Sequence, residues 1–192
     1  MPSVIECFLL EPTAEAQESL RRYAGVPDGQ PLCVPFGYHN ASTVLGRVAY
    51  AFSDRSGEGR DTTDHSDARW PKSCHCGYVF SDKDAWQYNI DRLYSRSDTG
   101  ELVTLDDAPV GAMWFAPWYE RHIKGPDGRC LVVKTPGGEW IVDSIPSNSK
   151  TPWTRSGVPP RVTASPSIGI GTGPNGGFKY HGWLRDGRLV EC

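Results

Sequence analysis

The stretch Phe178-Lys179-Tyr180-His181-Gly182-Trp183-Leu184-Arg185-Asp186-Gly187-Arg188-Leu189-Val190 carries the signal that decides the fold class. Two strand-like runs flank Asp186-Gly187, a pair that favours a tight turn between antiparallel strands. Two other segments have the same form: residues 92–105 around Asp98-Thr99-Gly100, and residues 129–143 around Pro136-Gly137-Gly138. The sequence from residue 92 onward therefore predicts a body of antiparallel hairpins.

The N-terminal half predicts helices as well as strands. Residues 4–10 and 44–52 are expected to be strands. Pro12-Thr13 opens a segment with Ala16, Leu20 and Tyr23 at helical spacing, which predicts a helix. Ser81 and Asp84 resemble a capping box and predict a short helix through Trp86 and Ile90. The expected class is α+β and β-rich, with one or two N-terminal helices.

Length and composition predict one soluble domain over residues 1–192, because 38% of the residues are hydrophobic. Within it, residues 53–80 are expected to form a polar loop followed by a knuckle-like insertion. The longest run without polar residues, 112–118, is far shorter than the roughly 20 residues of a spanning helix. The N-terminus has no basic leader, so we expect a cytosolic protein with no membrane partner.

The net charge of −3 conceals an uneven distribution. Residues 1–110 carry 17 acidic and 10 basic side chains, whereas residues 111–192 carry 6 acidic and 10 basic ones. This is either ordinary scatter over a folded surface or a basic face that meets phosphate or an acidic partner.

The segment Cys74-His75-Cys76-Gly77-Tyr78-Val79-Phe80 resembles a zinc-ribbon knuckle. In such a turn the glycine lets the backbone fold over the metal, and the aromatic residue packs beneath it. The segment differs from the usual knuckle in having Cys-x-Cys instead of Cys-x-x-Cys. We predict zinc here, with two incidental cysteines or a redox pair as the alternatives.

A tetrahedral site needs two more ligands. His65, which lies nine residues before Cys74, is the expected third ligand, and His39 or Cys33 the fourth. His75 is expected to point away, because both of its neighbours are ligands.

The hypothesis of a catalytic site depends on His181 as a general acid or base, with Asp143 as the carboxylate that orients it. The sequence contains no nucleophile elbow to support it, and a hydrogen-bonded structural histidine is the simpler interpretation of His181.

A third feature is the aromatic run at residues 111–119, followed at once by basic residues. Core packing explains the run most simply, and a stacking surface for a partner is the alternative. The candidate partner-binding residues are Trp114, Trp118, Tyr119, Arg121 and Lys124.

The residues His65-Ser66-Asp67-Ala68-Arg69-Trp70-Pro71 and Cys74-His75-Cys76-Gly77 resemble an uncharacterised family of tailed-bacteriophage proteins, notably from actinobacterial phages. Residues 108–114, 125–131 and 180–184 belong to the same pattern, so the resemblance spans residues 35–190. It implies a viral protein made in the cytoplasm of a bacterial host, and it implies no reaction.

Together these observations predict a zinc-stabilised phage accessory protein that acts by binding a host protein, a phage protein or a nucleic acid. One alternative is an enzyme that acts on a nucleotide, nucleic acid or host protein through His181 and Asp143. Another is a minor structural protein of the virion. The sequence leaves the oligomeric state open.

Overall fold

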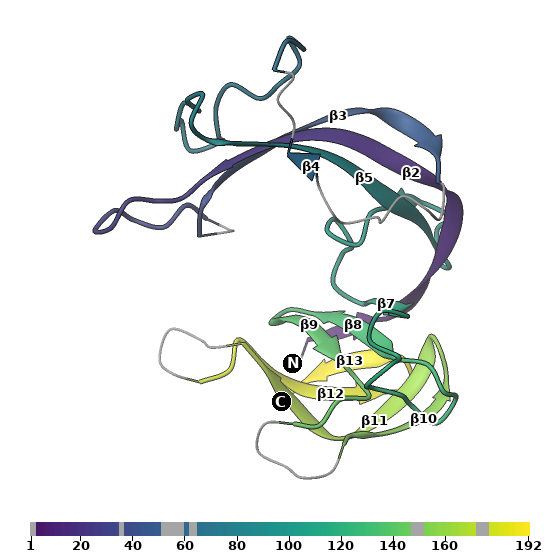
Figure 1. Ribbon diagram of the computed structural model, residues 1–192. Helices are drawn as coiled ribbons and strands as arrows, with labels where there is room; N and C mark the ends of the chain where they lie inside the picture. Colours follow the sequence, from purple (N-terminus) through teal and green to yellow (C-terminus); the bar gives the residue numbers. More distant parts are fainter. Residues whose placement is uncertain (1–2, 35–36, 51–59, 62–64, 147–151, 172–176) are drawn as a thin grey trace. The chain divides into compact units, whose positions relative to one another are not determined.

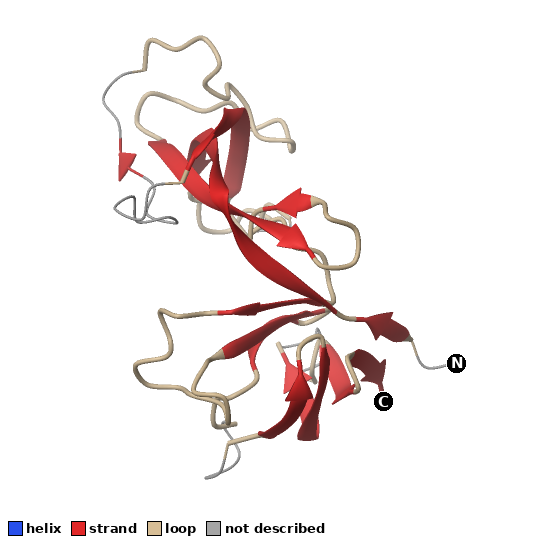
Figure 2. Cartoon of the chain, turned by 90° about the vertical axis from the view of Figure 1, so that its right-hand side faces the viewer, coloured by secondary structure: helices blue, strands red, loops and turns tan. Residues whose placement is uncertain are grey.

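The computed structural model describes residues 3–34, 37–50, 60–61, 65–146, 152–171 and 177–192. These residues form strands and loops and contain no helix (Figures 1 and 2). The first seven strands are β1 (Val4–Glu6), β2 (Phe8–Ala24), β3 (His39–Ala49), β4 (Arg60–Asp61), β5 (Ala85–Arg96), β6 (Leu102–Val103) and β7 (Ala112–Phe115). The remaining strands are β8 (Leu131–Thr135), β9 (Gly138–Ile141), β10 (Thr154–Val158), β11 (Arg161–Ile170), β12 (Tyr180–Arg185) and β13 (Arg188–Glu191).

The strands form two sheets. One is antiparallel with the order β1-β13-β12-β11-β10. The other follows the order β4-β5-β2-β7-β8-β9, with β3 beside β2 and β6 beside β5. The second sheet is mixed, because β2 pairs with β7 in parallel through Phe8 and Leu9.

The chain divides into two compact units. Unit 1 contains Met1–Glu11 and Tyr94–Cys192, and unit 2 contains Pro12–Leu93. Both boundaries fall inside a strand, since β2 and β5 contribute residues to each unit. The single-domain expectation for residues 1–192 therefore stays a prediction.

Unit 1 has an extensive apolar core. Strand β8 shows why: Leu131 and Val133 pack into one buried cluster, while Val132 packs into a second one. Side chains alternate across a strand, so β8 is covered on both faces and its apolar run is continuous.

Unit 2 has a much smaller core. Its apolar cluster consists of Ala24, Cys33, Cys74 and Phe80, with partly buried neighbours around them. The long pairing of β2 with β3, from Glu15 opposite Ala49 to Ala24 opposite His39, supplies most of its regular structure.

The predicted α+β class is wrong, and the segment from Pro12 to Tyr23 shows the reason. It lies in strand β2, not in a helix. Ala16 and Leu20 are buried, as a helix would have them, but a spacing of four also keeps side chains on one face of a strand. The register shift beside Glu18 and Ser19 leaves Leu45 of β3 without a partner, so β2 itself keeps its alternation.

The second predicted helix, at residues 81–90, is also wrong. The local bonds of a cap are present, because the Ser81 amide donates to Asp84 Oδ2 over 2.6 Å and the Asp84 amide donates to the Ser81 carbonyl over 3.0 Å. The chain then enters strand β5, whose Trp86, Tyr88 and Ile90 favour a sheet. Pairing with neighbouring strands thus outweighs a favourable helix start.

The three predicted hairpins are confirmed. In the β12–β13 hairpin Arg185 lies opposite Arg188, and Asp186 and Gly187 both have positive φ, as a two-residue type I′ turn requires. The β8–β9 and β5–β6 hairpins close around the expected glycine turns.

The strand expected at 44–52 corresponds to β3, which ends at Ala49; residues 51–52 lie outside the described residues. Most of the predicted polar loop, residues 53–59 and 62–64, is also outside them. The short strand β4 within it pairs with β5.

Two glycines with nearly equal φ allow a matched test of the β12–β13 turn. Gly187 has φ 72° and its added Cβ would collide with the Pro160 carbonyl, whereas Gly100 has φ 74° and open space. We expect Gly100→Ala to lower the free energy of unfolding by about 1 kcal/mol through backbone strain alone. Gly187→Ala should lower the free energy of unfolding by clearly more than Gly100→Ala does, as measured by urea unfolding. Equal losses for the two substitutions would contradict a collision at Gly187.

Candidate metal centre

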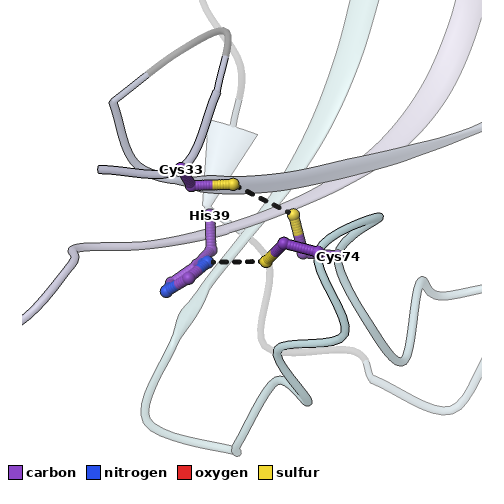
Figure 3. Close-up of side chains that lie close together, drawn as sticks. Cys33, His39 and Cys74 are labelled. Carbon is purple, nitrogen blue, oxygen red and sulfur yellow. Dashed lines mark hydrogen bonds between the residues drawn. The ribbon is translucent and has the colours of Figure 1, made fainter. Parts of the chain in front are cut away.

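Four side chains of unit 2 converge: Cys33, His39, Cys74 and Cys76. One ligand atom from each lies within 4.8 Å of all the others. Figure 3 shows Cys33, His39 and Cys74 pointing toward one another from separate stretches of chain. This donor set, three thiols and an imidazole, is one that tetrahedral metal sites use.

The contacts inside the cluster have the dimensions of a coordination sphere. Cys33 Sγ lies 3.7 Å from Cys74 Sγ, and Cys76 Sγ lies 3.3 Å from His39 Nδ1. In a tetrahedron with metal–sulfur distances of about 2.3 Å, two sulfurs stand about 3.8 Å apart. The cluster therefore has the geometry to hold a metal ion at its centre.

Cys74 and Cys76 are presented by a tight turn. The Cys74 amide donates to the Tyr78 carbonyl over 2.8 Å, and the Gly77 amide donates to the Cys74 carbonyl over 2.9 Å. Gly77 has φ 91°, a conformation that glycine adopts without the strain a side chain would bring. Ser73 and Val79 form a bridge across the same turn. The glycine predicted for a knuckle has its expected role, even with the shortened Cys-x-Cys spacing.

Cys33 and His39 come from the connection between β2 and β3. His39 is the first residue of β3 and lies opposite Ala24, the last residue of β2. Cys33 precedes it in a turn in which the Gly37 amide donates to the Cys33 carbonyl over 2.6 Å. The register of β2 and β3 thus places both ligands at one end of the strand pair.

The His39 ring is oriented by Tyr78. The two rings stack with their centroids 4.0 Å apart and an angle of 5° between planes. The Tyr78 hydroxyl donates to Asp84 Oδ2 over 3.2 Å, which fixes the tyrosine in turn. Support of this kind holds a ligating imidazole in one orientation.

Arg22 clamps the two ends of the turn that carries Cys74 and Cys76. From β2, its guanidinium donates to the Pro71 carbonyl over 3.4 Å and to the Ser81 carbonyl. The same group stacks over Trp86, with Cζ 3.5 Å from the ring centroid. Arg22 is buried, and burial lowers its pKa, although nearby carboxylates favour the charged form. A buried cation that bonds both ends of the loop is a positioning group for the ligands.

The thiols of the cluster differ in acidity. Burial opposes ionisation of Cys74, but hydrogen bonds from the backbone amides of Cys76 and Asn40, and from the thiols of Cys33 and Cys76, lower its pKa to about 6. Burial and the neighbouring sulfurs raise the pKa of Cys33. The cluster therefore favours one thiolate supported by its neighbours, and thiolate is the form that binds metal.

The structure brings together four of the five predicted metal ligands and places His65 elsewhere. The His65 ring stacks on Trp86 at 3.8 Å and meets Trp70 edge-on at 6.4 Å. His75, expected to point away, has its Nδ1 3.3 Å from Cys74 Sγ, but it is not one of the four side chains whose ligand atoms converge.

The proposed catalytic pair has separate partners. Asp143 is buried, and its two oxygens accept bonds from Arg155 Nε over 2.8 Å and from the Leu131 amide over 2.9 Å. His181 is exposed on β12, beside the rings of Phe178 and Trp183. No hydrogen bond joins these two described side chains, so the geometry adds no support to general acid–base chemistry.

The candidate partner-binding residues fall into two groups. Trp114 is buried in a core cluster of unit 1. Trp118 and Tyr119 are exposed, with ring centroids 6.0 Å apart, and Arg121 and Lys124 are exposed beside them in sequence. Only the second group is available to a partner.

The sequence interpretation missed the structural roles of Arg22 and Arg155. Arg155 forms an ion pair with Asp143 and another with Asp127, in which Nη2 and Asp127 Oδ1 are 2.6 Å apart. If residues 12–24 are taken as a strand, the alternation of side chains assigns Arg22 to the buried face, and a buried arginine stands out. If the same residues are taken as a helix, this signal is lost.

Comparison of the chain with protein-family models, curated proteins and solved structures finds no match. Among the described residues there is no helix of the length and hydropathy that crossing a membrane demands.

The clamp by Arg22 is testable with Arg22→Met, which keeps an apolar stem but removes both donors. We expect the free energy of unfolding to fall by about 2–3 kcal/mol, because two carbonyls lose a charged partner. Faster hydrogen exchange at the Cys74 and Gly77 amides should accompany the loss.

Arg47→Met is the matched control. Arg47 lies on β3 and forms an exposed ion pair with Glu15, with 3.8 Å between Nη1 and Oε2. Its removal should change stability by less than about 0.5 kcal/mol. Equal effects of the two substitutions would exclude a special role for Arg22.

Proposed function

We propose that the protein binds one zinc ion through Cys33, His39, Cys74 and Cys76, that the ion stabilises unit 2, and that the protein works by binding a partner. The observation that carries the metal assignment is the convergence of the four ligand atoms within 4.8 Å. Three sulfurs and one nitrogen are soft and borderline ligands, which favour zinc over hard cations such as Mg²⁺ or Ca²⁺.

The ion has a structural role because the protein supplies all four ligands. A catalytic zinc keeps one position open for water or substrate, and four protein ligands leave none. The small apolar cluster of unit 2, which itself contains Cys33 and Cys74, gives the ion a reason to be there. In small folds a bound metal supplies folding free energy that the core does not.

Metal analysis tests this assignment. Purified protein should contain about one equivalent of zinc, and a chelator should lower the midpoint of thermal unfolding. Cobalt substitution should give the visible absorption of a tetrahedral thiolate site. Cys74→Ser and His39→Ala should each remove the ion.

Two control variants sharpen the result. His65→Ala should keep the zinc, because His65 stacks on Trp86 instead of joining the cluster. Cys130→Ser should also keep it, since Cys130 is a buried thiol of unit 1. Less than about half an equivalent of zinc in the unmodified protein would overturn the assignment.

The partner we favour is single-stranded nucleic acid, contacted by the turn that carries Trp118, Tyr119, Arg121 and Lys124. Both aromatic side chains are exposed and lie next to one another, so together they offer a stacking surface. Bases stack on exposed rings, while neighbouring cations neutralise phosphates. The net charge of +4 over residues 111–192 agrees with this choice.

The resemblance to tailed-phage proteins supports action in the cytoplasm of a bacterial host.

Binding of a labelled oligothymidylate at low salt tests the partner. Trp118→Ala should weaken it at least about fivefold, because stacking of one base contributes roughly 1–3 kcal/mol. Replacing Arg121 and Lys124 by Gln should reduce the salt dependence of the affinity. Phe178→Ala is the matched control, since Phe178 is a comparably exposed ring outside this turn.

Absence of oligonucleotide binding at low salt would exclude this partner and leave the zinc assignment intact. An equal loss from Phe178→Ala would exclude the turn as the contact surface.

A further inference from the structure

Unit 1 contains a pocket of about 580 Å³ that neither the metal cluster nor the turn at 118–124 accounts for. Leu9, Phe115 and Val158 provide apolar lining, and Asp127, Arg129 and Arg155 provide charged lining. Pockets of this size, mainly apolar with a few placed polar groups, are typical of sites for small ligands.

Arg155 belongs to the wall of the pocket and is not available to a ligand. Its side chain is 1% exposed and lies between two carboxylates. Nε donates to Asp143 over 2.8 Å, and Nη1 and Nη2 donate to Asp127 over 3.2 and 2.6 Å. These bonds outweigh the effect of burial and raise the pKa of Arg155. Its charge and most of its donors are therefore used inside the fold.

The turn that precedes Arg129 is fixed by the same network. The Arg129 carbonyl accepts bonds from the Gly125 amide over 2.8 Å and from Arg155 Nη2 over 3.3 Å, while its amide donates to Asp127 Oδ1 over 3.1 Å. Gly125 has to be glycine here, because a Cβ would collide with Arg155 and Asp143. The backbone that carries Arg129 is thus held from three directions.

The Arg129 guanidinium is held over an aromatic ring with its donors unused. Cζ lies 3.4 Å from the centroid of Phe115, a cation–π contact that fixes the plane of the group. Within the described part of the chain, no acceptor bonds its side-chain nitrogens. A planar, oriented fork of donors beside an apolar cavity is suited to a carboxylate.

We propose that this pocket binds a carboxylate carried on an apolar body. Arg129 receives the carboxylate, and the body packs against Leu9, Phe115 and Val158. Asp127 and Asp143 together exceed Arg155 by one negative charge, so Arg129 brings the four groups to zero and is the cation among them whose side-chain donors are unused. A phosphate dianion would face the Asp127 carboxylate with only one free cation. The carboxylate is that of a small organic acid or of the C-terminus of a peptide.

Calorimetric titration with N-acetyl-L-phenylalanine tests the site, and its amide is the matched control ligand. The acid should bind, and the amide should bind at least about tenfold more weakly, because it lacks the charge that Arg129 recognises. Arg129→Met should reduce affinity for the acid by about tenfold as well, and Arg129→Lys should do so to a smaller extent.

Arg185→Met serves as the control variant. Arg185 is also exposed and stacks on a ring, with Cζ 4.7 Å from the centroid of Trp183, but it does not line the pocket. The affinity of the Arg185→Met variant for N-acetyl-L-phenylalanine should equal that of the unmodified protein. A peptide ending in free phenylalanine that binds more tightly than the acid identifies a chain terminus as the natural ligand, and equal affinity identifies a small acid.

The proposal is overturned if acid and amide bind equally, if Arg129→Met leaves the affinity unchanged, or if the acid shows no binding. Each of these results leaves the zinc and nucleic-acid proposals untouched, because those concern other residues.

Discussion

The packing of Cys33, His39, Cys74 and Cys76 into one small volume is the constraint on which unit 2 depends. Two of the four, Cys33 and Cys74, are also members of its apolar cluster, so the candidate metal site and the core are one structure. Long strands such as β2 and β3 order many residues, and ordering costs conformational entropy. Burial of the apolar cluster of unit 2, which consists of Ala24, Cys33, Cys74 and Phe80, offsets only a small part of that entropy cost. A metal ion held by these four donors would add to the apolar contacts of unit 2.

Both units use a buried arginine to fix a loop, but the two arginines are balanced differently. Arg155 in unit 1 has two carboxylates as partners, and its pKa is raised. Arg22 in unit 2 bonds to carbonyls and stacks on Trp86, and burial lowers its pKa. Burying a charge is costly unless the charge is paired or hydrogen-bonded, and Arg22 offsets this cost through its bonds to both ends of the ligand-bearing turn and through the nearby carboxylates. It depends on the turn as much as the turn depends on it.

The predictions from sequence were accurate where the deciding interactions are local and failed where they are not. The Asp186-Gly187 turn is specified by two adjacent residues with positive φ, and the turn around Cys74 and Cys76 by a single glycine. The helix expected at 12–23 failed because a spacing of four fits one face of either element, and the long pairing with β3 decides between them. His65 is close to Cys74 in sequence, but its ring stacks on Trp86 and does not join the cluster. The sequence offers His39 or Cys33 as the fourth ligand, and the structure brings both to the cluster, because Cys33 lies in the connection between β2 and β3 and His39 begins β3.

Arg129 and the metal cluster show opposite ways of using polar groups in this protein. The four donors of the cluster face inward and complete one another, so the site is closed and suits a structural ion. Arg129 is held just as firmly by its backbone and by Phe115, yet its guanidinium has no acceptor among the described residues. The fold orients this side chain before any ligand arrives, which reduces the entropy that binding would cost. A side chain that is held rigidly but has hydrogen-bond donors without acceptors is suited to binding a ligand, whereas one whose donors are all used within the fold has a structural role. By that criterion, recognition of an anion in unit 1 belongs to Arg129 and not to the more deeply buried Arg155.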